Sequence, residues 1–425
     1  MTRSYHLPGT ERTRRNFSLR ARRAPRLNGS EAGFSLIEAL VATVIMVTVT
    51  GAVFTVLNPS SGIFQTQPEV SDMQQRMRVG VDALKHDLIM AGAGAYSGAQ
   101  SGSLTGFFAP ILPSRQGNLA SLDDGPGVFF PDRITLFYVP STFSQTSISQ
   151  AMPNASAELK VNGEPGCPND DLCGFTEGET VLIYDDTGSF DTMTITAVQN
   201  AALHLQHNQQ GDLSKSYGVG AKVVQIQEHS YYLDSTTHQL MHYDGFQTAS
   251  PVLDNVVGLN FEYYGEPTPP TLKRPGVDQT VTYGPKPPAL GVTLGTWPAG
   301  ENCTIKVVAG QQVSRLGTLG APNGGLVKLN DASDPNSPLL TDGPWCPGGT
   351  QTGNAFDADL LRVRKVRVSI RVQTGNAALR GAATGATDAR FTNAGTSSGG
   401  YKLVPDQAIR FDVSPRNLNL GRCPS

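Results

Sequence analysis

The sequence predicts an α+β protein in which a long N-terminal helix precedes a domain of antiparallel strands. Three observations carry this prediction: an apolar run over residues 34–57, a helical apolar stripe over residues 70–88, and short alternating runs from residue 133 onwards. The 425 residues are 39% hydrophobic and 16% charged, which is typical of a globular protein with a sizeable core. With 46 Gly and 29 Pro, long ordered loops are expected and a helical bundle is not.

Residues 34–57 are long and apolar enough to cross a membrane. Seventeen of these 24 side chains are apolar, and Glu38 is the only ionisable one. As a helix they would extend roughly 36 Å, against a hydrocarbon core of ~30 Å. Twelve of the 24 are Val, Ile or Thr, which favour strands in water. A lone segment in a bilayer must nevertheless be helical, because only a helix satisfies its own backbone there.

The flanking charges predict the orientation of this segment. Residues 1–33 hold eight Arg against two Glu, a net charge of +6, whereas residues 34–425 hold 25 basic and 34 acidic residues, a net charge of −9. The positive-inside rule therefore keeps residues 1–33 in the cytoplasm and exports everything after Leu57, including the globular domain of residues 92–425. A secretory signal peptide fits less well, because its apolar region is only about 7–15 residues long. A permanent signal anchor fits the length but gives no reason for Glu38.

Glu38 needs a partner, because a carboxylate in the apolar span costs at least ~2.5–3.5 kcal/mol. Cleavage between Gly33 and Phe34 would create a new α-amino group four residues before Glu38. When two such helices pack side by side, the amine of one copy can pair with the carboxylate of the other and set their axial offset. The sequence therefore predicts that this charge serves assembly.

The eleven residues from Glu31 to Val41 resemble the cleavage and methylation motif of type IV pilins and type II secretion pseudopilins; they read EAGFSLIEALV. The resemblance implies that a prepilin peptidase cuts after Gly33 and methylates the amine of Phe34, with Glu38 at the acidic position of the family. It also implies a pilin-like fold whose residues 1–33 are a cleaved basic leader. The protein would then be a single-pass inner-membrane protein with a periplasmic C-terminal domain before it joins a pilus or pseudopilus, which can reach the cell surface.

Later segments resemble PilW-type minor pilins: Gln74–Arg76, Leu84–Gly92, the run from Tyr231 to Tyr264, and Asp412–Asn417. This implies a non-enzymatic subunit without a cofactor that primes type IV pilus assembly or forms part of a tip complex. The implied partners are the prepilin peptidase, other minor and major pilins, and a tip adhesin. The J-type minor pseudopilins of type II secretion share the layout but are usually shorter. Two further classes would also account for the anchor: a tethered binding module or enzyme that is not cleaved, and a DNA-uptake pilin.

Residues 58–91 are predicted to form a kink and an amphipathic periplasmic helix. Pro59 should break or kink the helix at the membrane surface, because it removes a backbone donor, and a second helix should begin near Pro68. Its apolar stripe consists of Val70, Met73, Met77, Val81, Leu84 and Leu88. We expect the stripe to pack on a sheet of the same chain, with a neighbouring subunit's helix as the alternative. Gly92 and Gly94 should end the helix.

Nine strands are predicted where short alternating runs are bounded by Gly, Asp, Asn or Pro. They are residues 133–139, 180–184, 191–198, 201–205, 222–232, 238–242, 256–264, 361–372 and 408–413. In the run 361–372, alternation predicts one buried and one wet face. Short turns at 197–200 and 235–237 predict antiparallel hairpins.

Residues 265–348 hold 13 of the 29 Pro, which predicts a surface excursion rather than a second core. Partner contacts and a passive loop are its two interpretations.

The five Cys all follow residue 166, on the exported side, which fits an oxidising compartment. The candidate disulfides are Cys167 with Cys173 and Cys303 with Cys346, which leaves Cys423, although the sequence alone does not decide the pairing. No C-x-x-C spacing occurs, so zinc at these cysteines is not expected.

The remaining motifs are interpreted as structural, and no metal site is predicted. The histidines at 204, 207, 238 and 242 lack an HExxH arrangement and are interpreted as surface residues. Residues 395–399 match G-x-S-x-G without the strand and helix of a nucleophile elbow. Acidic pairs at 123–124, 170–171 and 185–186 could hold Ca²⁺, but solvated turns are favoured. A basic stripe at 362–371 could contact DNA, yet it lacks interleaved aromatics, so nucleic acid is not an expected partner.

Overall fold

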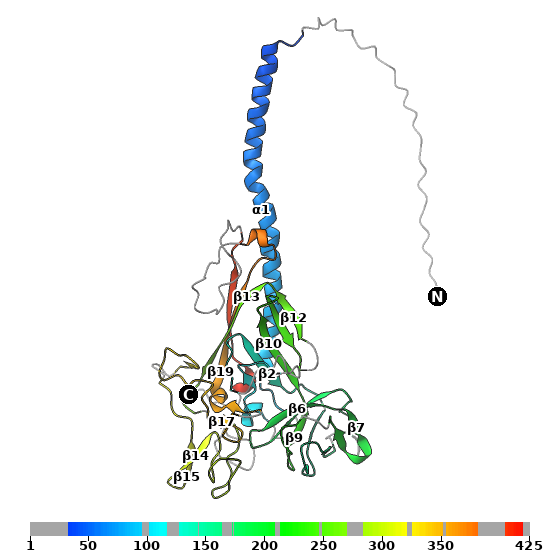
Figure 1. Ribbon diagram of the computed structural model, residues 1–425, viewed down its shortest axis with the longest axis vertical. Coiled ribbons are helices and arrows are strands. Elements are labelled where there is room, and N and C mark those ends of the chain that lie inside the picture. The colour runs from blue at the N-terminus through cyan, green and yellow to red at the C-terminus, as the bar shows by residue number, and fades with distance from the viewer. Residues whose placement is uncertain are drawn as a thin grey trace, which may run out of the picture. The chain divides into compact units, whose positions relative to one another are not determined.

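Figure 1 shows the computed structural model of the chain, in which a long helix precedes a β-rich region. The structure describes residues 33–95, 102–116, 127–142, 144–163, 172, 174–208, 213–245, 249–269, 284–320, 325–351, 354–380 and 404–419; over 58–65 it describes the backbone alone. The chain divides into two compact units, Met1–Ser61 and Gly62–Ser425.

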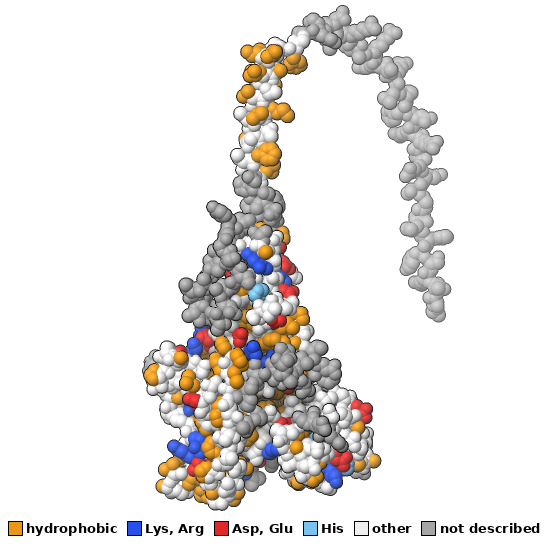
Figure 2. Space-filling view, in the orientation of Figure 1, with side chains coloured by type: hydrophobic (Ala, Val, Ile, Leu, Met, Phe, Trp, Pro, Cys, Tyr) orange, Lys and Arg blue, Asp and Glu red, His pale blue; other side chains and the backbone are white. Residues whose placement is uncertain are grey.

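Helix α1 (Leu36–Met90) carries the segment that can span a membrane. Leu36–Leu57 has a mean hydropathy of 2.4 and is not buried anywhere along its length. Figure 2 shows its hydrophobic side chains at the surface of the helix. Of the break or kink predicted at Pro59, the break is wrong, and so is a second helix that begins near Pro68, because α1 continues through these residues as one helix. A proline inside a helix removes one hydrogen bond, which a helix can absorb by bending rather than ending.

In the second unit, the predicted apolar stripe packs on a sheet of the same chain. Met73, Leu84 and Leu88 are fully buried in the main core, Met77 and Val81 nearly so. Gly80 lies so close to β12 (Ala249–Asp254) that an added Cβ would be 3.2 Å from the Leu253 Cβ. Just past the end of the helix, Gly92 has a φ of +81° and its N–H donates to the Phe137 carbonyl oxygen at 2.8 Å. The glycine thus ends the helix as predicted, because φ is positive there.

Two antiparallel sheets enclose the main core with α1. The first has the order β1 (Ile111–Leu112), β2 (Arg133–Tyr138), β10 (Gln227–Asp234), β11 (Gln239–Tyr243) and β12. The second has the order β16 (Val327–Lys328), β13 (Val256–Gly265), β19 (Val363–Val372) and β20 (Gln407–Val413). Short 3₁₀ helices follow α1 or flank the strands: η1 (Leu104–Gly106), η3 (Ala358–Arg362), η4 (Ala377–Leu379) and η5 (Arg416–Leu418).

A second hydrophobic core, which the sequence did not predict, lies between two smaller sheets. One has the order β3 (Gln145–Ser147), β9 (Lys222–Gln225), β5 (Thr180–Tyr184) and β6 (Phe190–Thr194). The other has the order β4 (Leu159–Lys160), β8 (His204–Gln206) and β7 (Ala197–Gln199), with η2 (Asn200–Ala202) before β8. Strand β5 serves both cores, because Val181 and Ile183 face the second one while Leu182 and Tyr184 face the main one.

Each of the nine predicted strands overlaps a strand of the structure, and the hairpin predicted at 235–237 is confirmed as β10–β11. The turn predicted at 197–200 is misplaced, because Ala197–Gln199 is strand β7, which pairs with β8 after the chain turns through η2. Two predicted runs are each divided: 191–198 into β6 and β7, and 222–232 into β9 and β10. Between β9 and β10 the chain leaves one sheet for another at Ile226. The wet face predicted for β19 is wrong, since Ser369 and Arg371 are buried. Arg371 instead donates to the Val257 carbonyl oxygen at 3.3 Å.

The buried leucines among the described residues of the Pro-rich excursion belong to the main core. Leu316, Leu329 and Leu340 are buried there, and Cys303 and Cys346 form the predicted disulfide with their Cα atoms 5.3 Å apart. The excursion also contains short strands that the sequence did not predict: β14 (Ile305–Val308), β15 (Gln311–Ser314) and β17 (Trp345–Cys346), which pairs with β18 (Phe356–Asp357). Burial of these leucines anchors a loop that sequence alone places at the surface.

Candidate functional site

The bond between Gly33 and Phe34 lies just before α1, outside regular secondary structure. Phe34 is 90% exposed, and a side chain added at Gly33 would meet no atom within 4 Å. Among the described residues, nothing covers this bond.

Glu38 and Ser35 form a reciprocal cap at the first turn of α1. The Ser35 N–H donates to Glu38 Oε2 at 3.0 Å, and the Glu38 N–H donates to Ser35 Oγ at 3.2 Å. This is a capping box, which satisfies two backbone donors that a helix start otherwise leaves without partners. Sequence reasoning missed it, although the S-x-x-E spacing was its signal. The cap fixes the carboxylate at the helix start and leaves Glu38 exposed.

A second polar cluster surrounds Asp87, in the last part of α1. Asp87 is buried between Leu84 and Leu88 on the stripe that faces the first sheet. The Tyr231 hydroxyl donates to Asp87 Oδ2 at 2.6 Å, and the Tyr138 hydroxyl donates to Oδ1 at 3.4 Å. Burial, followed by the effect of Asp87, raises the pKa of Tyr138 to about 12 and that of Tyr231 further. Both phenols are therefore protonated donors at neutral pH.

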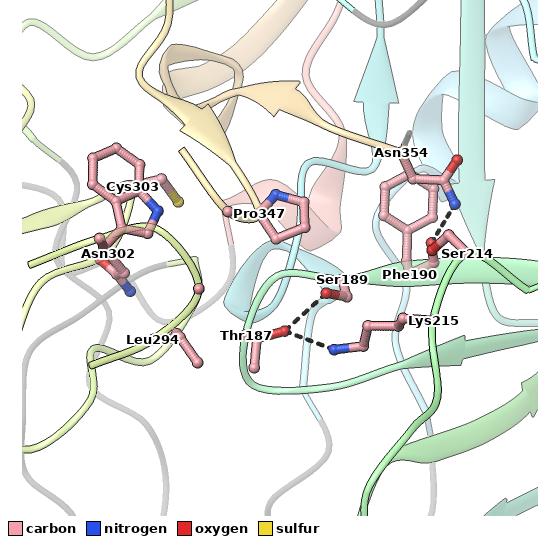
Figure 3. Close-up of a pocket in the computed structure, with 13 residues that line it drawn as sticks. Thr187, Ser189, Phe190, Ser214, Lys215, Leu294, Asn302, Cys303, Pro347 and Asn354 are labelled. Atoms are coloured by element: carbon pink, nitrogen blue, oxygen red, sulfur yellow. Dashed lines mark hydrogen bonds between the residues drawn. The ribbon is translucent and has the colours of Figure 1, made fainter. Parts of the chain in front are cut away.

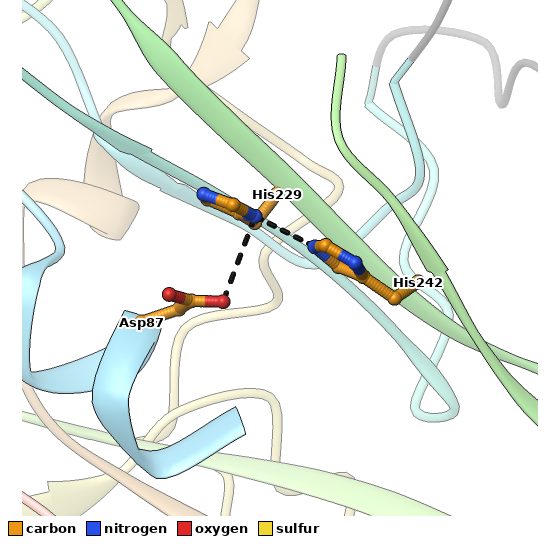
Figure 4. Close-up of side chains that lie close together, drawn as sticks. All are labelled: Asp87, His229 and His242. Carbon is orange, nitrogen blue, oxygen red and sulfur yellow. Dashed lines mark hydrogen bonds and ion pairs between the residues drawn. The ribbon is translucent and has the colours of Figure 1, made fainter. Parts of the chain in front are cut away.

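Two imidazoles that meet edge to edge complete this cluster (Figure 4). His229 on β10 and His242 on β11 have ring centroids 4.9 Å apart and ring planes 12° from parallel. His229 Nδ1 lies 2.6 Å from His242 Nε2 and 3.6 Å from Asp87 Oδ2. Burial lowers the pKa of both histidines. Each imidazole is therefore neutral near pH 7, with one acceptor nitrogen.

Sequence reasoning interpreted His242 as a surface residue and did not single out Asp87 or His229. The interpretation of His242 is wrong, because its ring is half-buried against His229 and Tyr231. One signal was available: a carboxylate at 87 interrupts the apolar stripe between two leucines. The register that brings the two histidines together depends on the β10–β11 pairing, which residue spacing alone does not give.

A cavity of about 470 Å³ lies between the excursion and the smaller sheets (Figure 3). Leu294 and Trp297 of the excursion line one side, and Phe190, Lys215 and Asn354 also contribute. The Lys215 ammonium already donates to Asp185 at 2.6 Å and to Thr187 at 3.2 Å. This lysine is therefore held within the chain, while the apolar lining comes largely from the excursion.

The basic stripe at 362–371 does not form an exposed surface. Arg362, Arg364 and Arg371 are buried, and Arg362 Nε lies 2.6 Å from Asp359. Lys365 and Arg367 both donate to Asp412, and these partners lower the pKa of that carboxyl to about 2. The sequence had left DNA contact open; these arginines are instead used within the fold.

The other sequence motifs give no second site. His207 is buried and bonds the Ala157 carbonyl oxygen at 3.0 Å, so its surface interpretation is wrong, whereas His204 pairs with Glu158 at 3.1 Å. The predicted disulfide between Cys167 and Cys173 lies outside the described residues. So do Cys423, residues 395–399 and the acidic pairs at 123–124 and 170–171.

The chain matches no protein-family model, no curated protein and no solved structure.

Proposed function

We propose that the protein is a minor pilin of the PilW type. It waits in the inner membrane, is cut by a prepilin peptidase after Gly33, and joins a type IV pilus through the first part of α1. The observation that carries this proposal is the EAGFSLIEALV sequence, whose only two ionisable side chains are Glu31 and Glu38, at the start of an unburied apolar helix.

The geometry at the helix start supports both proposed steps. The bond to be cut is exposed and precedes α1, and the new amine would arise four residues before Glu38. The Glu38 carboxylate accepts the Ser35 N–H, and a carboxylate has about four acceptor positions. It can therefore keep its cap and still bind the amine of a neighbouring copy.

The two parts of α1 would then have different partners. Leu40, Val47 and Phe54 are all more than half exposed, so they are available to lipid before assembly and to neighbouring helices afterwards. The stripe from Met73 to Leu88 is already occupied by the sheets of its own chain. Assembly through residues 34–57 therefore needs no rearrangement of the second unit.

The size of the second unit favours a few copies at a filament tip over many along a shaft. It has two cores and an excursion that lines a cavity, which suits priming of assembly or presentation of an adhesive surface. The same N-terminal residues would also serve a J-type minor pseudopilin of type II secretion. Co-purification of the processed protein with pilus or with pseudopilus subunits distinguishes the two.

The test is incorporation of Glu38→Ala in cells that make filaments. We expect membrane insertion to be normal or better, since the substitution removes a cost of ~2.5–3.5 kcal/mol. Incorporation should fall about 10-fold or more, because an amine left without its partner costs ~3–5 kcal/mol in the interior of a packed bundle. Asp72→Ala is the matched control, because it removes an exposed carboxylate of the same helix. Normal incorporation of processed Glu38→Ala would contradict the proposal.

A further inference from the structure

We propose that Asp87, His229 and His242 bind one divalent transition-metal ion of the Zn²⁺ class, which joins the end of α1 to the first sheet. The proposal does not depend on the function proposed above. It departs from the expectation that the protein binds no metal, and it rests on side chains that the fold brings together from three elements.

The three donor atoms already converge. One carboxylate oxygen and one nitrogen from each imidazole all lie within 4.8 Å of one another. Ligands about 2.0–2.2 Å from a tetrahedral Zn²⁺ are roughly 3.3–3.6 Å apart. The distance of 3.6 Å from Asp87 Oδ2 to His229 Nδ1 already fits this geometry. The lone-pair directions of His229 Nδ1 and His242 Nε2 face each other at 2.6 Å, so a tetrahedral ion would require both rings to turn until these nitrogens are roughly 3.3–3.6 Å apart.

The chemistry of the donors selects the class of metal. Imidazole nitrogen suits Zn²⁺ and its transition-metal neighbours, whereas Mg²⁺ and Ca²⁺ take oxygen ligands. Without a metal, one of the two facing nitrogens donates its proton to the other in a hydrogen bond; with Zn²⁺ bound, that ring would carry its proton on its other nitrogen, so that both facing nitrogens offer a lone pair to the ion.

The groups around the donors are those that orient metal ligands. His229 Nε2, the ring nitrogen opposite the proposed ligand atom, lies 3.2 Å from the Tyr138 hydroxyl oxygen, to which it can donate. The Tyr231 hydroxyl holds the Asp87 carboxylate. Such contacts fix the imidazole tautomer and the carboxylate direction at metal sites. Three protein ligands leave a fourth position, which water would fill.

The competing interpretation is a hydrogen-bonded polar cluster that joins helix and sheet without a metal. Both interpretations use the same contacts, so the geometry does not distinguish them. Binding of a metal ion does. A bound ion would crosslink α1, β10 and β11, and it would raise the melting temperature of the second unit increasingly as the free ion concentration exceeds its Kd.

The experiment uses the full chain in detergent, without a polyhistidine tag and stripped with a chelator. Titration with ZnCl₂ by calorimetry should give one site per chain, and X-ray absorption should show two nitrogens and oxygen ligands at about 2.0–2.2 Å. His242→Gln and His229→Gln should each weaken binding about 10-fold to 100-fold. His238→Asn is the matched control, because it removes an imidazole outside the cluster at a residue with φ of 55°, which Asn tolerates.

Circular dichroism checks that each variant is folded. Misfolding is least expected for His242→Gln, because His242 is only half-buried. One site that is lost in His242→Gln and kept in His238→Asn supports the proposal. Absence of stoichiometric Zn²⁺ binding, or equal binding by wild type and His242→Gln, overturns it and leaves the polar cluster.

Discussion

Helix α1 carries two carboxylates in apolar surroundings, Glu38 and Asp87, which differ in their burial and in their hydrogen-bond partners. Asp87 is buried and has two tyrosines and a histidine of its own chain around it. Glu38 is exposed, and among the described residues its hydrogen bonds are those of the cap with Ser35. The apolar residues near each follow the same division, because those near Asp87 are buried and those near Glu38 are not.

This difference separates a carboxylate that the fold has already satisfied from one that needs a partner outside the chain. A buried charge is kept only where its hydrogen bonds are made, and Asp87 meets this condition inside the second unit. Glu38 would enter an apolar medium with one N–H as its partner, and in the role proposed above a second copy supplies the counter-charge. On that proposal, the first carboxylate contributes to folding and the second to assembly.

Blocking cleavage is expected to have the largest effect. Gly33→Val places a branched side chain beside the bond to be cut, and the structure has room for it because nothing lies within 4 Å. Without cleavage no amine forms, so incorporation should fall about 10-fold or more, as for Glu38→Ala. In a double variant, the two losses should not add, since both remove one ion pair. Additive losses, measured in purified filaments, would show that Glu38 acts without the amine.

Leu84→Ala should destabilise the second unit by about 2–5 kcal/mol, because a fully buried side chain leaves a cavity. Val79→Ala on the exposed face of the same helix, and Val47→Ala in the apolar span, should change its stability by less than about 0.5 kcal/mol. Denaturant unfolding of the detergent-solubilised chain measures all three. Equal effects at Leu84 and Val47 would remove the division between a folding part and an assembly part of α1.

Tyr231→Phe removes the shorter of the two tyrosine bonds to Asp87 and should cost about 1.5–3 kcal/mol, as hydrogen bonds to charged groups do. Tyr138→Phe is the matched variant and should cost less, since its bond is 3.4 Å long. Thermal unfolding of both variants provides the measurement. A larger loss of stability for Tyr138→Phe than for Tyr231→Phe would mean that Asp87 depends mainly on Tyr138.

The smallest effect is expected for Ser35→Ala, which removes the cap but keeps the Glu38 charge. The first turn should lose about 0.5–2 kcal/mol, seen as faster hydrogen exchange at the Glu38 amide. Incorporation should stay close to that of wild type. If Ser35→Ala impaired incorporation as strongly as Glu38→Ala, the cap and not the ion pair would be the function of Glu38.

The parts of the fold that local pattern determines were predictable: the apolar span, the stripe on α1, the glycine that ends the helix and most strands. The second core was not, because β5 is buried on both faces and a continuous apolar run does not say which face meets which core. The Asp87 cluster depends on the pairing of β10 with β11 and on the helix that covers it, which are contacts far apart in sequence. The candidate cleavage site lies within the continuous run EAGFSLIEALV, so it could be suggested from the sequence alone.

Mass analysis of the protein isolated from membranes is the decisive measurement for the proposed role of Glu38. We expect a chain that begins at Phe34, carries one added methyl group on its α-amine and lacks residues 1–33. A chain that retains Met1–Gly33, or begins at any residue other than a methylated Phe34, would contradict that role, because Glu38 would then have no amine to bind.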